Sequence, residues 1–234
     1  MEPQAAKILA LETATEGCSA ALWVDGTVTQ RFEVIPRAHA RLILPMMDAL
    51  LAEAGLTPKD LDALAFGRGP GAFTGVRVAV GVVQGAAFAA DRPVVPVSTL
   101  AALAQQAVDA GASRVLAALD ARMGEVYWGA FEAREGLAQA VAGECVCPPQ
   151  AVPVPPSPGW TAVGRGWTVH GEALLQRLEG RVDALPDADR IPRAAEVARL
   201  AVREWAMGRA VPAEAALPVY LRDRVAEPPA GAGR

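Results

Sequence analysis

The sequence has few of the residues that carry metal and hydrolytic chemistry. It contains two histidines, His39 and His170, far apart among 234 residues. A catalytic zinc site needs about three protein ligands, usually with histidine among them. The H-E-x-x-H pair of zinc proteases and the G-x-S-x-G turn of α/β hydrolases are both missing from the sequence. These absences argue against a metallopeptidase and against a serine hydrolase.

The sequence also lacks a concentration of positive charge. The formal net charge is −4, and no run of clustered lysines and arginines stands out. Domains that bind nucleic acid strongly are usually basic, with Lys and Arg gathered on one face. If nucleic acid is the final substrate, we expect another chain to hold it.

Long apolar runs and a basic leader are missing as well. The longest apolar stretch, residues 78–90, is interrupted by Gln84 and is too short to span a bilayer. Residues 1–11 do not form a basic-then-apolar leader. The cysteines are sparse and odd in number, and we expect Cys145 and Cys147 to be a reduced, packed pair rather than a metal site. These features predict a cytoplasmic protein without a membrane segment.

What the sequence does contain is a regular succession of strand and helix patterns. It opens with three strand-like runs, the last two joined by the hairpin signal Asp25-Gly26. The expected strands are residues 7–13, 18–24, 27–35, 62–67, 93–97, 114–120, 126–132 and 161–163, and the expected helices are residues 40–54, 73–90, 100–110 and 192–207. Short loops that join strands through helices favour parallel pairing. The pattern therefore predicts an α/β fold.

The second half of the chain resembles the first. KILALET at residues 7–13 aligns with VLAALDA at residues 115–121, which pairs Glu12 with Asp120. We infer an internal duplication, with one half at residues 1–111 and a smaller one at residues 112–234. The smaller half contains a proline-rich loop, residues 148–158, which we expect to be an exposed, irregular excursion.

The glycine-rich stretch at residues 67–85, GRGPGAFTGVRVAVGVVQG, has no P-loop lysine and no G-x-G-x-x-G spacing. We therefore interpret its first glycines as a strand-to-helix turn. The glycine pairs Gly71/Gly75 and Gly81/Gly85 are each four residues apart, so each pair shares a helix face. Glycine costs about 1 kcal/mol relative to alanine inside a helix. We expect close packing to offset that cost, either within the domain or against a partner.

The carboxylates of Glu12 and Asp120 end two equivalent predicted strands. Facing each other across a cleft, they can hold Mg²⁺ through water. This pairing supports an alternative function, a nucleotide-binding ATPase or phosphotransferase. The simpler interpretation is that each carboxylate accepts hydrogen bonds from a turn.

Several segments together resemble one family, the bacterial TsaB proteins. They are ILALETATEGCSAALWVDGTV, RAHARLILPMM, ALAFGRGPGAFTGVRVAVGVVQGAAFA, PVSTLAALA, DARMGEVYW and PVYLR, and the resemblance runs from about residue 7 to residue 226. It implies an actin-like, Hsp70-like ATPase fold of two ribonuclease-H-like halves. It also implies a non-catalytic dimerization subunit for threonylcarbamoyl transfer to the adenosine beside the anticodon of tRNA.

The resemblance further implies partners and an interface. The partners are the catalytic paralogue TsaD, the ATPase TsaE, and a second copy of the chain when it is alone; tRNA is held mainly through these partners. The interface is a bundle of the helices at residues 41–54 and 73–90. Its candidate contacts are Leu42, Pro45, Met46, Leu50, Gly75, Val76, Ala79 and Val83.

The resemblance implies no metal or cofactor of the chain's own. The paralogue holds its metal with Val-Asn-His-x-x-x-His, and Thr99 and Leu103 occupy the two histidine positions here. The superfamily's first-strand acid is commonly Asp, and here it is Glu12, which weakens the ATPase alternative. A nucleotide at the seam with the partner stays open, as does direct tRNA contact through Arg222 and Arg224.

Overall fold

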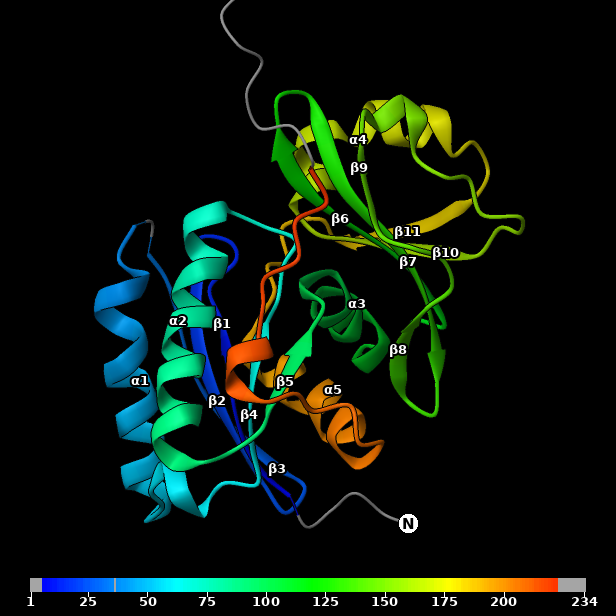
Figure 1. Cartoon of the computed structure of the whole chain (residues 1–234). Helices are drawn as coiled ribbons and strands as arrows, with labels where there is room; N and C mark the ends of the chain where they lie inside the picture. The colour runs from blue at the N-terminus through cyan, green and yellow to red at the C-terminus, as the bar shows by residue number, and fades with distance from the viewer. Residues whose placement is uncertain (1–5, 36, 223–234) are drawn as a thin grey trace, which may run out of the picture.

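The computed structural model describes residues 6–35 and 37–222, which form two β-sheets with helices packed around them (Figure 1). The first sheet has the order β3-β2-β1-β4-β5. Its strands are β1 (Lys7–Glu12), β2 (Gly17–Val24), β3 (Thr27–Val34), β4 (Ala63–Gly67) and β5 (Val94–Val97). The second sheet has the order β11-β10-β6-β7-β8, and β9 also pairs with β7. Its strands are β6 (Arg114–Arg122), β7 (Glu125–Arg134), β8 (Leu137–Ala140), β9 (Cys145–Cys147), β10 (Trp160–Val163) and β11 (Val182–Asp187).

The two sheets repeat one topology. In the first, β1 pairs antiparallel with β2 and parallel with β4. In the second, β6 pairs antiparallel with β7 and parallel with β10. The strand orders also correspond, with β6 in the place of β1. The predicted duplication is therefore confirmed, and Glu12 and Asp120 lie on equivalent strands.

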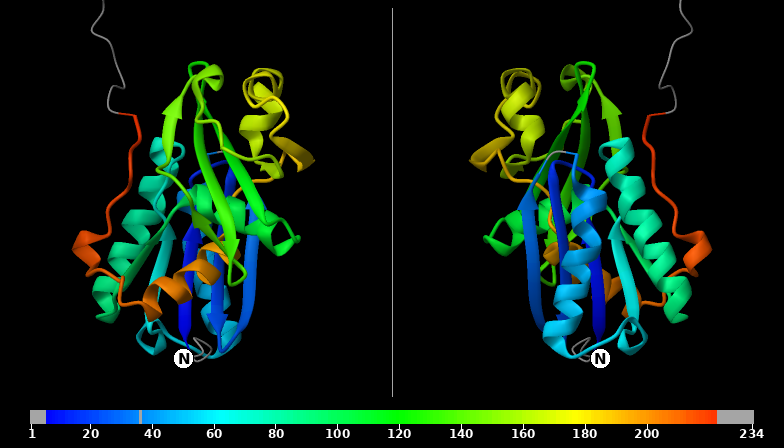
Figure 2. Two further views of the ribbon diagram at one scale, coloured as in Figure 1. Left: turned by 90° about the vertical axis from the view of Figure 1, so that its right-hand side faces the viewer. Right: turned by 90° about the vertical axis from the view of Figure 1, so that its left-hand side faces the viewer.

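Five α-helices surround the sheets in the described part of the chain. They are α1 (His39–Ala54), α2 (Phe73–Ala90), α3 (Thr99–Asp109), α4 (Arg165–Arg177) and α5 (Ala194–Ala206). Side chains alternate between the faces of a strand, so β1 sends Leu9 and Leu11 to one face and Ile8 and Ala10 to the other. The leucine face packs on α1 and α2, and the opposite face packs on α5 (Figures 1 and 2).

The halves exchange helices. The late helix α5 covers the first sheet, where Val197 shares an apolar cluster with Ile8. The earlier helix α3 covers the second sheet, where Leu100 and Leu103 cluster with Phe131. A division between residues 111 and 112 therefore follows the sequence repeat but not the packing. The first half of the molecule is the sheet containing β1 with the helices that cover it, and the second half is the sheet containing β6 with the helices that cover it.

Local sequence signals account for the ends of two helices. The Oγ of Ser98 accepts the Ala101 N–H at 3.1 Å and caps α3. Gly55 ends α1 with φ of 66°. The proline-rich loop differs from expectation, because Pro149 and Pro155 are buried and Val152 packs in the core of the second half. It is thus partly a packed segment rather than a wholly exposed excursion.

Candidate functional site

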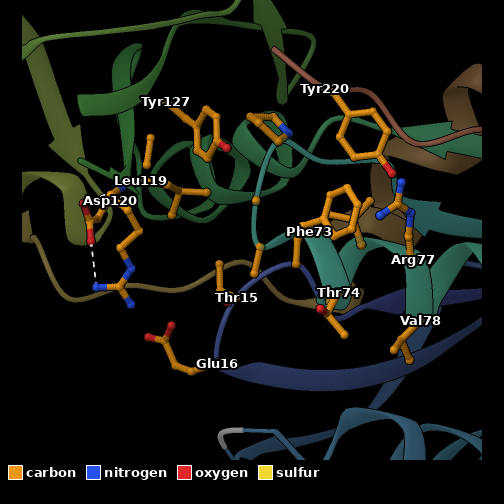
Figure 3. A pocket seen from close by; sticks show the side chains of 18 of the residues that line it. Thr15, Glu16, Phe73, Thr74, Arg77, Val78, Leu119, Asp120, Tyr127 and Tyr220 are labelled. Carbon is orange, nitrogen blue, oxygen red and sulfur yellow. Dashed lines mark hydrogen bonds and ion pairs between the residues drawn. The ribbon is translucent and has the colours of Figure 1, made fainter. Parts of the chain in front are cut away.

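A cavity of about 1060 Å³ lies where the two halves meet (Figure 3). The first half lines it with residues 14–16, the start of α1 and the first turns of α2. The second half contributes the end of β6, Tyr127 and part of α4. The segment 219–222 completes the lining. The cavity is therefore built from chain segments that are far apart in the sequence.

Asp120 reaches this cavity. Its Oδ1 accepts the Arg122 N–H at 3.0 Å, and its Oδ2 lies 3.1 Å from the Arg122 guanidinium. The Nε2 of His170 lies 3.4 Å from Oδ1. The carboxylate thus does what the simpler interpretation predicted, since it accepts a turn N–H, and it is also paired with a cation.

Glu12 does not join Asp120 in the cavity. Its side chain is fully buried, and it accepts the Ala14 N–H at 2.6 Å and the Thr99 hydroxyl at 3.1 Å. Burial raises the pKa of Glu12 to about 7, although these hydrogen bonds oppose the shift. The simpler interpretation therefore holds for Glu12 too, since its carboxylate accepts an N–H from the turn after β1. The alternative of two carboxylates facing one cleft is contradicted, because the chain itself encloses the Glu12 side chain.

The glycine-rich turn lets α2 approach the loop after β1. The Ala72 N–H donates to the Ala14 carbonyl at 2.7 Å, and the Thr13 hydroxyl donates to the Gly75 carbonyl at 2.7 Å. A Cβ at Gly71 would overlap the Ala14 carbonyl oxygen, and one at Gly75 would overlap that of Thr13. This glycine pair therefore serves contact within the chain.

The second glycine pair is different. An added Cβ at Gly81 or Gly85 would meet nothing within 4 Å. These positions lie on the solvent side of α2, near its exposed Phe88, whose side chain is 82% exposed. On the neighbouring α1, Leu44 is 49% exposed. The outer face of α1 and α2, defined here by Leu44, Pro45, Gly81, Gly85 and Phe88, thus exposes apolar side chains and bare helix backbone to solvent, together with the charged Arg41 and Asp48 on the same side of α1.

Six of the eight predicted contact residues lie inside the chain instead. These buried positions are Met46, Leu50, Gly75, Val76, Ala79 and Val83. Leu42 is partly buried against the same core, and Pro45 is exposed. These positions lie on the sides of α1 and α2 that face the sheet, so they are not free to contact another chain. That α1 and α2 form the partner interface stays a prediction.

The packing of α2 and α3 bears on the membrane-span and metal-ligand patterns in the described residues. Among the described residues, α2 alone has the length and composition of a membrane-crossing helix, yet its Val76, Ala79 and Val83 pack in the first half's core. No group of three or more His, Cys, Asp or Glu in the described residues is arranged to hold a metal. Thr99 and Leu103 are fully buried.

Cys145 and Cys147 lie on β9 with their sulfurs 3.9 Å apart. Both are partly buried free thiols. Burial raises the pKa of Cys147 to about 12. The pair therefore packs as neutral thiols, as expected.

A cluster that the sequence analysis missed forms one wall of the cavity. The Arg77 guanidinium lies 3.3 Å from the Phe73 ring centroid and 5.2 Å from that of Tyr220 (Figure 3). The spacing of Phe73 and Arg77, four residues apart on one helix, is the local signal for their contact. Arg222 donates to the Ala121 carbonyl at 3.0 Å and pairs with Glu125. Arg224 lies outside the described residues.

Two copies of one α/β unit with a cavity between them define the actin-like, Hsp70-like ATPase fold of two ribonuclease-H-like halves. A family model described as TsaD, tRNA N6-adenosine threonylcarbamoyltransferase, matches residues 33–230. The chain is 45% identical to the tRNA threonylcarbamoyladenosine biosynthesis protein TsaB of Escherichia coli, over 94% of this chain and 96% of the relative. The protein of the same name from Haemophilus influenzae is 41% identical over 93% and 94%. The chain belongs to the TsaB family.

Solved structures agree with this assignment. The structure titled YeaZ from Pseudomonas aeruginosa superposes with a TM-score of 0.85 at 50% identity, covering 92% of this chain and all of that one. A second structure from the same organism, titled an uncharacterized protein with similarity to peptidase YEAZ, gives a TM-score of 0.86 at 50% identity, over 93% and 100%.

Proposed function

We propose that this chain acts in threonylcarbamoyladenosine modification of tRNA as a non-catalytic subunit that pairs with a TsaD-type paralogue. Its relatives over nearly the whole chain are named for that biosynthesis. A TsaE-type ATPase joins the pair, tRNA is held mainly by the partners, and the chain is cytoplasmic and forms a homodimer when alone. It has no metal or cofactor of its own, and any nucleotide sits at the seam between subunits.

The observation that carries this proposal is the outer face of α1 and α2. Gly81 and Gly85 lower the stability of α2 relative to alanine. A Cβ added at either position would meet no atom within 4 Å. The exposed apolar side chains Leu44 and Phe88 lie on the same helices. A partner helix that packs against Gly81 and Gly85 recovers that cost through close contact. The face therefore suits a helical bundle with another subunit.

The test uses leucine at the open glycines. We expect Gly81→Leu and Gly85→Leu to abolish the complex with the TsaD-type paralogue, and also the homodimer, while circular dichroism shows a folded chain. Light scattering after size exclusion measures both assemblies. Gly171→Leu in α4 is the matched control, because it too has open space around the glycine, and it should leave both assemblies intact. A complex that survives both α2 variants rules out this surface.

Variants at buried positions cannot serve this test. A side chain at Gly75 would overlap the Thr13 carbonyl, and Met46 is buried in the first half's core. Gly75→Leu and Met46→Asp would therefore damage the fold itself.

The alternative, an ATPase or phosphotransferase using Glu12 and Asp120, has less support. The carboxyl of Glu12 is enclosed by its own chain, and Asp120 is paired with Arg122. Calorimetric titration of the isolated chain with Mg-ATP tests it: binding and turnover that vanish in Asp120→Ala would favour this alternative.

A further inference from the structure

Folding gathers arginines that the sequence disperses. Five arginines line the cavity between the halves, against two carboxylates, Glu16 and Asp120. The arginines are Arg37, Arg77, Arg122, Arg165 and Arg222. The whole chain has a net charge of −4, so the cavity is a local exception. The sequence shows no run of clustered lysines and arginines, because these five arginines lie far apart along the chain and meet only in the folded structure.

Three of these arginines are held by carboxylates and two are not. Arg122 pairs with Asp120, Arg165 with Glu16, and Arg222 with Glu125. Arg37 and Arg77 are exposed, and neither forms an ion pair within the residues that the structure describes. They are the cations in this cavity that remain available to an external anion.

Exposed aromatic rings lie beside one of the available cations. Phe73 is 56% exposed and Tyr220 is 44% exposed, and their ring centroids are 5.7 Å apart. Arg77 lies over the Phe73 ring (Figure 3). Large exposed rings next to a guanidinium offer stacking and charge at one place.

The helix starts add to the positive potential. The first residues of α1, α2 and α4, which are His39, Phe73 and Arg165, all line the cavity. None of the three helices has an acidic residue in its first turn. The positive ends of the α1 and α2 dipoles are therefore not opposed by acids of their own first turns, whereas Glu16 pairs with Arg165 at the start of α4.

We propose that this cavity binds a single-stranded segment of RNA, with phosphates at Arg37 and Arg77 and a base stacked on Phe73 or Tyr220. Proteins hold single-stranded nucleic acid by combining a positive groove with aromatic stacking platforms. An acidic peptide would satisfy the arginines but has no use for two exposed rings. The proposal rests on the proposed function, because a tRNA-modifying assembly brings RNA to this chain.

The test measures binding of the full chain, without partners, to a fluorescein-labelled oligouridylate by fluorescence anisotropy at several salt concentrations. We expect weak, salt-dependent binding. Arg37→Gln and Arg77→Gln should each weaken RNA binding at least about threefold. Each should also reduce the slope of log affinity against log salt concentration by about the amount expected for one lost phosphate contact. Phe73→Leu and Tyr220→Leu should each weaken it about fivefold or more through lost stacking. Tyr220→Phe should keep the wild-type affinity.

Controls and competitors separate this proposal from others. Arg134→Gln, an exposed arginine of β7 outside the cavity, should bind like the wild type. Absence of binding, or equal weakening by Arg134→Gln, overturns the proposal. Displacement of the RNA by polyglutamate at equal charge, or by ATP at similar concentration, would assign the cavity to an acidic peptide or a free nucleotide instead. Because complex formation is measured separately by light scattering, this failure leaves the proposed function standing.

Discussion

At the scale of single residues, the buried carboxyl of Glu12 makes folding depend on pH. Burial raises its pKa in the folded chain from 4.5 to about 7. The folded state therefore binds the proton more tightly than the unfolded state does. The resulting stability is fully present below pH 4.5 and is lost as the pH rises through about 7.

Glu12→Gln should remove this dependence. We expect the free energy of unfolding of the wild type to fall relative to the variant by up to roughly 3 kcal/mol between pH 4.5 and 7. Urea denaturation at a series of pH values measures the difference. The exposed Glu214 supplies the control, since Glu214→Gln should follow the wild type. Parallel profiles for Glu12→Gln and the wild type would mean that the buried carboxyl does not take up a proton on folding.

Single residues also show where sequence reasoning stops. The four-residue spacing within the pairs Gly71/Gly75 and Gly81/Gly85 predicted close packing but could not say against what. Gly75 faces the Thr13 carbonyl of its own chain, whereas Gly81 faces open space. That distinction depends on how α2 sits on β1, which is a tertiary fact. The gathering of the five cavity arginines was missed for the same reason, because only folding brings them together.

At the scale of the element, α2 is a helix with two different faces. One face packs Val76, Ala79 and Val83 into the core, and the other leaves Gly81 and Gly85 bare. Its nearly continuous apolar sequence suggested burial all round. The structure buries one face and leaves the other exposed to solvent.

The two faces should respond oppositely to the same substitution. Gly81→Ala fills open space and restores helix propensity, so we expect it to stabilise the isolated chain by up to about 1 kcal/mol. Gly75→Ala forces α2 away from the loop after β1, so we expect a loss of about 2 kcal/mol or more. Urea denaturation monitored by circular dichroism compares them, at a concentration where the chain is monomeric. Equal effects of the two alanines would contradict the division of α2 into two faces.

Elements with strong periodicity could be predicted from the sequence, and elements without it could not. The expected bounds of α2, residues 73–90, agree with the structure. The short strands β8 and β9 carry too few residues for a pattern. Helix α4 was missed because its sequence, RGWTVHGEALLQR, contains two glycines and few apolar positions at helical spacing.

At the scale of the whole molecule, each sheet is covered by a helix from the opposite half of the sequence, which joins the two sheets into one structure. The repeat in sequence was readable from matching strands, but it could not reveal that α5 covers the first sheet and α3 the second. The C-terminal segment adds a further link. Val219 donates to the Arg68 carbonyl at 2.8 Å, and Arg222 contacts the second half at Ala121 and Glu125. Each half therefore needs chain from the other half of the sequence.

This exchange makes the sequence repeat a poor guide to what folds alone. A chain of residues 1–111 keeps the first sheet but lacks α5, which leaves the face bearing Ile8 bare. We expect it to show no cooperative unfolding by circular dichroism, because that apolar face has lost its cover. A peptide of residues 190–210 added in trans should restore protection of the β1 amides from hydrogen exchange, whereas the same peptide with Val197→Asp should not, since Val197 packs in this cluster. Cooperative unfolding of residues 1–111 alone would show that the first sheet is stable without the helix contributed by the end of the chain.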